Sequence, residues 1–169
     1  ARPRAEQELR GAGRGGNARL VLASGAIGGL DALSSASIGA LKEVAYVGRK
    51  PPEGWRGSPA ETVLDLDTLT TATVHFDGTA RACALAYPKN ANVAASVALA
   101  GLGFDKTRAQ LIADPTITQN IHEVTATGDF GSFTFQISGQ SLPDNPRSSA
   151  LAAMSVISKL DALNAVVTL

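Results

Sequence analysis

The sequence predicts an α/β (α+β) fold in which helices pack on a mixed, largely antiparallel sheet. In residues 132–138 apolar and polar side chains alternate, which is the pattern of a half-buried strand. A second strand candidate, residues 121–127, is separated from it only by the residues 128–131 (GDFG), which are a hairpin signal. An alanine-rich helix candidate, residues 93–102, precedes both. At 169 residues the chain has the length of about one domain with a real core.

Before this region, helix, strand and loop signals alternate. The charged residues 4–10 predict a helix, and the apolar residues 18–23 predict a short strand. Residues 24–29 form a loop with three glycines and few side chains, which lets a ligand approach the backbone closely. A short helix is expected over residues 30–37, and a strand over residues 44–47.

Ser58, Pro59 and Glu61 combine three helix-start signals, so a helix is expected to begin there. They supply a capping serine, a proline at the first helical position and a glutamate three residues after the cap. The other predicted elements are strands at residues 73–76 and 107–112, helices at 79–86 and from 145 to about 162, and a closing strand at 166–169.

Charge and composition narrow the function classes. Fifteen basic and fifteen acidic residues cancel, so no overall field draws the protein to nucleic acid or to an anionic membrane. The longest near-apolar run, residues 93–104, is too short to cross a bilayer, and residues 1–6 lack the apolar core of a signal peptide. We therefore expect a cytoplasmic protein. Cys83 is expected to be a small buried side chain, and no His, Cys and carboxylate cluster has metal-ligand spacing.

Residues 11–16 (GAGRGG) satisfy the Gly-x-Gly-x-x-Gly pattern, but their context argues against a dinucleotide fingerprint. Such a turn follows a strand and opens a helix, so that the helix N-terminus faces the pyrophosphate. Here a helix-like stretch comes before the glycines and a strand-like stretch after them. We interpret the glycines as the cap and turn that end a helix.

Polar side chains at the start of the alanine-rich helix are the first candidates for a site. Lys89, Asn90 and Asn92 place a cation and two carboxamides there, although either asparagine could simply cap the helix. His122 lies on a predicted strand and can transfer protons near neutral pH, but a lone histidine on a strand is often a hydrogen-bonded core residue. His75 matches no motif, so we expect a surface or structural role for it.

Five motifs follow one another along the chain: SGAIGGLDA at residues 24–32, GRKPP at 48–52, PKNANVAA at 88–95, NIH at 120–122 and NPRSS at 145–149. In this order and at these separations they resemble the L-aspartate dehydrogenase family over essentially the whole chain. The beginning departs from the family, whose members open with a nucleotide-binding domain of roughly a hundred residues. The resemblance implies a remnant of that domain at residues 1–23 and a C-terminal substrate and dimerisation domain at residues 24–169.

The resemblance implies oxidation of L-aspartate at its amine-bearing carbon, with NAD or NADP as the cofactor. The product, iminoaspartate, hydrolyses to oxaloacetate and ammonia or feeds NAD biosynthesis. By their positions in the motifs, Ala26 and Asn92 correspond to cofactor-contacting residues and His122 to the active-site residue. A backbone group at Ala26 can meet a cofactor without steric conflict, and the Asn92 carboxamide can recognise an amide such as that of nicotinamide.

A dicarboxylate substrate needs cationic partners, and the candidates are Lys89, Arg49 and Lys50, with a weak preference for Lys89. A homodimer is expected, and the missing nucleotide-binding domain is an implied partner. Two alternatives stay open: the substrate domain of a related homoserine dehydrogenase or dihydrodipicolinate reductase, and a non-catalytic oligomerisation module. The choice between NAD and NADP depends on a residue in the absent domain.

Overall fold

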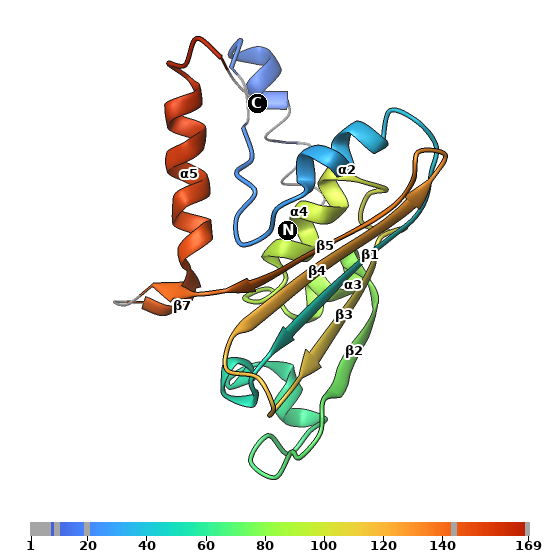
Figure 1. Ribbon diagram of the computed structural model, residues 1–169, viewed down its shortest axis with the longest axis vertical. Coiled ribbons are helices and arrows are strands. Elements are labelled where there is room, and N and C mark those ends of the chain that lie inside the picture. Colours follow the sequence, from blue (N-terminus) through green and yellow to red (C-terminus); the bar gives the residue numbers. More distant parts are fainter. Residues whose placement is uncertain (1–7, 9–10, 19–20, 143–144, 168–169) are drawn as a thin grey trace.

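The protein is described by a computed structural model that places residues 8, 11–18, 21–142 and 145–167. A five-stranded sheet in the order β2-β3-β1-β4-β5 forms its centre. Helices α3 and α4 cover one face of the sheet and lie behind it in Figure 1, α2 packs against α4 beside the β5 edge, and the opposite face of the sheet is turned toward the viewer. The mixed α/β fold with helices packed on a sheet is confirmed.

All but one of the neighbouring strand pairs in this sheet are antiparallel. The exception is β1 (Leu41–Lys50) with β3 (Arg108–Ala113), which run parallel. The antiparallel partners are β2 (Thr73–Thr79) with β3, β4 (Asn120–Gly128) with β1, and β5 (Gly131–Gly139) with β4. The strands predicted in these five regions and the hairpin between the last two are confirmed.

The helices on the sheet also follow the sequence signals. They are α2 (Leu30–Ala36), α3 (Ala80–Ala86) and α4 (Asn92–Ala100). Thr79 caps α3, because its side-chain oxygen accepts a hydrogen bond of 3.1 Å from the Ala82 N–H. Small alanine side chains let α4 pack closely against α2 and α3.

The core lies between the sheet and these helices. Val44 and Tyr46 of β1, Leu111 of β3 and Val124 of β4 all point into it, since alternate residues of a strand share a face. Trp55 and Tyr46 are the largest fully buried side chains. Cys83 is buried in the same cluster, as predicted.

A helix does end at the glycine-rich segment near the start, but it runs through most of that segment, so only the last glycine belongs to the predicted turn. Residues 11–15 are helical, and Asn17 follows with a positive φ of 49°. The Ala18 N–H donates to the Gly13 carbonyl and the Gly16 N–H to the Ala12 carbonyl, each at 2.9 Å, which is a Schellman-type end. The predicted helix at residues 4–10 lies mostly outside the described residues.

The helix predicted from Ser58 is only a single 3-10 turn, η2 (Pro59–Thr62). Ser58 does accept a hydrogen bond from the Ala60 N–H, so the start signal is correct. The helix stops because Leu66 is buried and Leu64 packs against the core, while Asp65 between them is exposed. This alternation requires an extended chain. A second 3-10 turn, η1 (Pro52–Trp55), precedes it.

Three further predictions are wrong in the described residues. Residues 18 and 21–23 form no strand, and residues 19–20 of that prediction lie outside the described part. The helix predicted from residue 145 begins only at α5 (Ala150–Ala162), because β7 (Asn145–Ser149) pairs with β6 (Ser141–Leu142) instead. Residues 166 and 167 form a bend, and residues 168–169 are not described.

Candidate functional site

His122 lies on β4 with its side chain on the helix-covered face of the sheet and is 6% exposed. It shares this face with Val124 and Ala126, as the strand alternation predicts. Its Nδ1 atom is 2.9 Å from the hydroxyl oxygen of Tyr46, which lies on β1. Burial raises the pKa of the Tyr46 phenol, so the hydroxyl stays protonated at neutral pH and fixes one side of the imidazole ring.

Gly48 makes room for this contact. It stands opposite His122 in the β1–β4 register. A Cβ atom added at Gly48 would lie 2.5 Å from the Tyr46 hydroxyl oxygen and 3.2 Å from Leu111 Cδ2. Because Gly48 has no side chain, the Tyr46 ring can lie over it and reach His122, with 6.0 Å between the two ring centroids.

The second ring nitrogen of His122 is the chemically available one. In the described part of the chain, Nε2 makes no hydrogen bond, and it is not among the fully buried atoms that lack a partner. It therefore keeps contact with solvent. Burial, with a smaller contribution from nearby Lys50, lowers the pKa of His122 to about 4. At neutral pH the imidazole is thus uncharged, and Nε2 carries a lone pair in the tautomer whose Nδ1–H donates to the Tyr46 oxygen.

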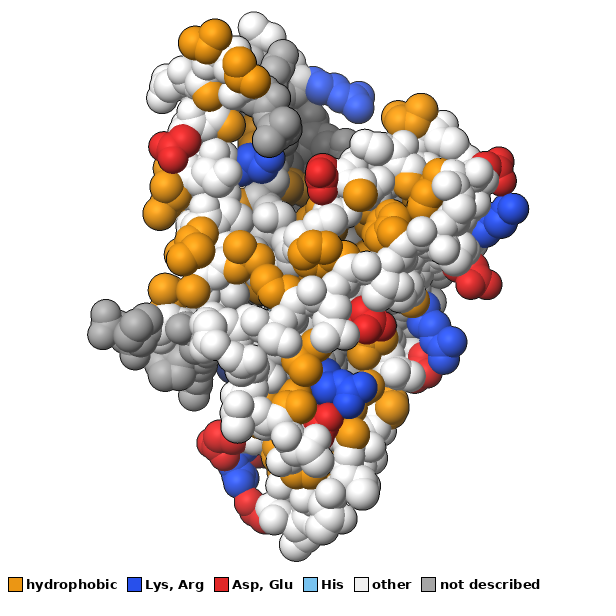
Figure 2. Space-filling model, viewed as in Figure 1, with side chains coloured by type: hydrophobic (Ala, Val, Ile, Leu, Met, Phe, Trp, Pro, Cys, Tyr) orange, Lys and Arg blue, Asp and Glu red, His pale blue; other side chains and the backbone are white. Residues whose placement is uncertain are grey.

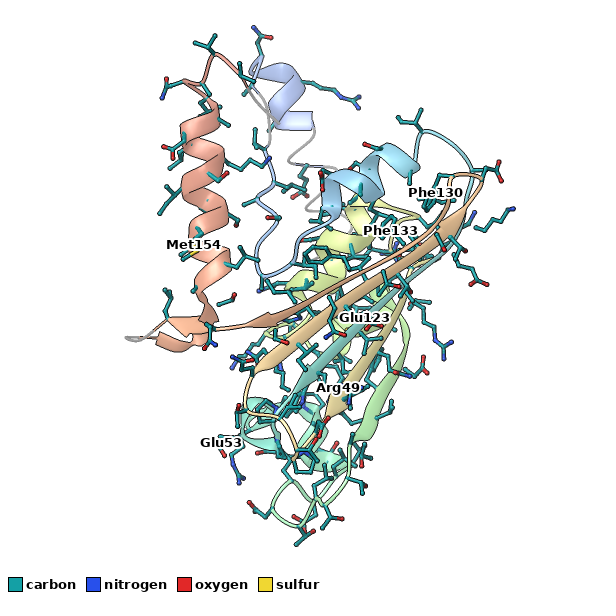
Figure 3. The ribbon with its side chains drawn as sticks, in the orientation of Figure 1. Arg49, Glu53, Glu123, Phe130, Phe133 and Met154 are labelled. Carbon is teal, nitrogen blue, oxygen red and sulfur yellow. The ribbon has the colours of Figure 1, made fainter. Side chains whose placement is uncertain are left out.

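The three cations that could bind carboxylates are far from equivalent. Arg49 points to the outer face of the sheet, where Figure 3 shows it together with Glu123, and its guanidinium is 2.8 Å from Asp114. Lys89 is exposed and lines a separate pocket of about 220 Å³. Only Lys50 lies near enough to His122 to influence its pKa.

Ala26 sits in the predicted glycine loop, which the fold holds in place. Gly25 has a positive φ of 72° and its N–H donates a 3.1 Å hydrogen bond to Ser155 Oγ on α5. A Cβ at Gly28 would lie 2.5 Å from the ring of Phe135 on β5. The fold therefore requires glycine at both positions, at Gly25 for its backbone conformation and at Gly28 for the space it leaves to Phe135. Ala26 itself is half-buried, so part of it is open to a ligand.

Asn92 is exposed and is the first residue of α4. The N-cap position belongs to Ala91, and no side chain caps this helix. The alternative interpretation, in which Asn90 or Asn92 caps the helix, is therefore wrong. The Asn92 carboxamide makes no hydrogen bond within the described residues and can offer a donor and an acceptor to a ligand.

No hydrogen bond links Ala26, Asn92 and His122 to one another in the part of the chain that the structure describes. Their neighbours do share one packed cluster, because Ile27 and Val93 belong to the same core as Val124. The two candidate cofactor contacts are thus anchored to the body that holds His122.

His75 has the contacts of a structural residue, which is one of the two roles expected for it. Its Nδ1 is 3.0 Å from the Tyr87 hydroxyl oxygen, and its ring packs edge-on against Trp55 with 4.3 Å between centroids. Burial lowers the pKa of His75 to about 4, and its Nε2 is buried without a hydrogen-bond partner. Because these contacts come from distant segments, no local motif could have indicated them.

The described residues contain neither a metal-binding cluster nor a membrane-spanning helix. No group of three or more His, Cys, Asp or Glu side chains there could hold a metal ion. Nor does this part of the chain contain a helix with the length and hydrophobicity that crossing a bilayer demands.

Comparison with known proteins gives a consistent result. Residues 31–163 match the model of the family described as aspartate dehydrogenase, C-terminal. An L-aspartate dehydrogenase of Ruegeria pomeroyi is 64% identical over 90% of this chain, and one of Cupriavidus necator is 52% identical over 94%. This chain spans only 56% and 59% of the lengths of those two relatives.

A solved structure agrees with the sequence comparisons. The crystal structure of aspartate dehydrogenase from Thermotoga maritima superposes with a TM-score of 0.75 and 29% sequence identity. The superposition covers 97% of this chain and 61% of that one.

Proposed function

Since this chain belongs to the aspartate dehydrogenase family, we propose that it forms the substrate-binding, C-terminal part of an L-aspartate dehydrogenase. The reaction is the oxidation of the amine-bearing carbon of L-aspartate to give iminoaspartate. Water then adds to the imine, and ammonia leaves to give oxaloacetate, unless the imine is used for NAD biosynthesis. The proposed location is the cytoplasm.

The observation that carries this proposal is the state of His122. Its imidazole is neutral at neutral pH, is held by Tyr46 at Nδ1 and has Nε2 in contact with solvent. In the tautomer whose Nδ1–H donates to the Tyr46 oxygen, Nε2 carries a lone pair and can take a proton from the substrate ammonium group, which leaves an amine whose lone pair can form the C=N bond. Once that proton has passed to solvent, the same nitrogen can take a proton from the water that attacks the imine.

The chain also offers contacts for a nicotinamide cofactor, NAD or NADP. The half-open Ala26 in its glycine loop and the unpaired carboxamide of Asn92 fit this role. When bound, such a cofactor supplies a hydride acceptor for the carbon that carries the amine. Ala26 and Asn92 would orient it, while His122 handles protons only.

The proposed division places residues 1–23 with a nucleotide-binding domain and residues 24–169 in the substrate domain. Helix α5 supports this arrangement, because it stands off from the sheet in Figure 1 and exposes large apolar side chains, such as Met154 and Ile157, each 60% exposed. Figure 2 shows hydrophobic side chains gathered along α5, and Figure 3 labels Met154 on this helix. A further domain packed on this side would cover them.

A homodimer is part of the same proposal. The outward-facing side chains of β5 (Ser132, Thr134, Gln136 and Ser138) are uncharged and exposed. This uncharged strip along β5, at the edge of the outer face, is suited to pairing with the same strip of a second copy.

The direct test is a chimera that joins the N-terminal part of the Ruegeria pomeroyi relative to this chain. We expect it to reduce NAD or NADP when L-aspartate is added, and to respond far less to D-aspartate or L-homoserine. Titration calorimetry with NAD and NADP checks that the chimera is assembled. A chimera that binds the cofactor but never oxidises L-aspartate would contradict the proposal, and oxidation of L-homoserine instead would point to the related enzyme.

A further inference from the structure

Lys50 is the last residue of β1 and lies on the same face of the strand as Tyr46 and Gly48, because alternate residues share a face. This is the face that His122 occupies on the neighbouring strand. The pairing of Arg49 with Ile121 brings the ends of β1 and β4 together at this point, next to Asn120. The ammonium group of Lys50 therefore reaches out from the same end of the sheet as the His122 imidazole.

Rigid neighbours surround the Lys50 side chain. Its Nζ atom is 5.0 Å from the centre of the Trp55 ring, and Trp55 is fully buried and donates a 3.0 Å hydrogen bond to the Ile112 carbonyl. The stem packs against Gly54, where an added Cβ would lie 3.2 Å from Lys50 Cβ and 3.8 Å from Asn120 Oδ1. The lysine stem is thus held by packing, and the Asn120 carboxamide lies beside the same glycine.

Among the side chains that the structure describes, no carboxylate neutralises this cation. Within the described residues Lys50 takes part in no ion pair, whereas the adjacent Arg49 on the other face is paired with Asp114 at 2.8 Å. Burial lowers the pKa of Lys50, which is the sign of a partly desolvated cation without an anionic partner. An anionic ligand would remove this cost, because it would stabilise the charged form of the lysine.

We propose that Lys50 binds a carboxylate of the substrate beside His122, with the Asn120 carboxamide as a second hydrogen-bonding neighbour. The choice of a dicarboxylate as ligand rests on the proposed function. The assignment takes the place of the sequence-based preference for Lys89, which is exposed and lines the separate pocket with Tyr87 and Pro88. Lys50 would hold the substrate, and His122 would move its protons.

Titration calorimetry with succinate tests this assignment, since succinate carries both carboxylates but no amine to oxidise. The chimera described above, saturated with NAD, is compared with its Lys50→Met and Lys50→Gln variants. Loss of a hydrogen bond to a charged group predicts that succinate binds about 10- to 100-fold more weakly to both. Lys50→Arg should keep part of the affinity, and the matched control Lys89→Met should bind succinate as the parent does.

Two outcomes would overturn the inference. One is an unmodified chimera that binds NAD but shows no affinity for succinate. The other is a Lys50→Met or Lys50→Gln variant that keeps the parent's melting temperature and whose dissociation constant for succinate is within about twofold of the parent's. Lys50→Gln provides this comparison if Lys50→Met fails to fold. Succinate binding that depends on Lys50, in a chimera that never oxidises L-aspartate, would refute the proposed function and leave the carboxylate site standing.

Discussion

Replacing Gly48 by alanine should break the contact between Tyr46 and His122. The new Cβ would lie 2.5 Å from the Tyr46 hydroxyl oxygen and 3.0 Å from Tyr46 Cζ, distances that packed atoms do not tolerate. Tyr46 is 1% exposed, so its ring has little space in which to move away. The hydroxyl must shift off the His122 Nδ1 atom.

The size of the effect follows from three terms. Overpacking in a core costs about 1–3 kcal/mol, and the lost hydrogen bond adds about 1 kcal/mol. Alanine is favoured over glycine in a strand by roughly 0.5–1 kcal/mol, which opposes these losses. We expect Gly48→Ala to lower the free energy of unfolding by about 1–3 kcal/mol.

A double-mutant cycle with Tyr46→Phe makes this prediction specific. Tyr46→Phe alone should cost about 1–2 kcal/mol, because His122 Nδ1 loses its partner. In the double variant the hydrogen bond is lost only once and the closest clash is gone. Its loss of unfolding free energy should therefore be smaller than the sum of the two single losses by about 1 kcal/mol or more. Urea unfolding followed by fluorescence of Trp55, the single and fully buried tryptophan, measures all four proteins. Strict additivity would refute the steric reasoning.

Two further predictions concern the chain as it stands. His75 and His122 have folded pKa values of about 4, against an ordinary value of 6.5; their stabilising contribution is therefore complete above pH 6.5 and is lost as the pH falls toward 4. The free energy of unfolding should drop by up to about 2 kcal/mol per histidine between pH 7 and pH 5, and a flat urea midpoint over this range would disprove the burial effect. The chain alone should show negligible affinity for NAD or NADP by calorimetry, whereas saturable micromolar binding would reveal a cofactor site within these residues.

Local sequence patterns were sufficient to predict a strand or helix where that element follows its own periodicity. The alternation in β5 and the capping of α3 by Thr79 each depend on a few consecutive residues. The prediction of secondary structure failed where pairing with another segment determines the conformation. Asn145 and Pro146 have the form of a helix start, yet Leu142 pairs with Asn145 and draws the segment into a two-stranded ribbon.

The candidate site shows the same division. The face of β4 that carries His122 could be predicted from alternation, and the family motifs led to the role proposed for it. Its partner Tyr46 is 76 residues away along the chain, and the need for Gly48 arises only from the register of two strands. The choice between Lys50 and Lys89 likewise depends on which strand end lies beside His122, which no sequence spacing reveals.

The most direct test of the central claim is the turnover number of the chimera with His122→Asn. Asparagine can keep a hydrogen bond to Tyr46 but cannot take up a proton, so packing is largely retained while the acid-base group is lost. We expect the turnover number with L-aspartate to fall by about 10²–10⁴-fold, with the melting temperature and the affinity for NAD nearly unchanged. Tyr46→Phe, which disturbs only the support of the ring, should lower turnover much less. A well-folded His122→Asn variant with near-normal turnover would contradict the assignment of the chemistry to His122.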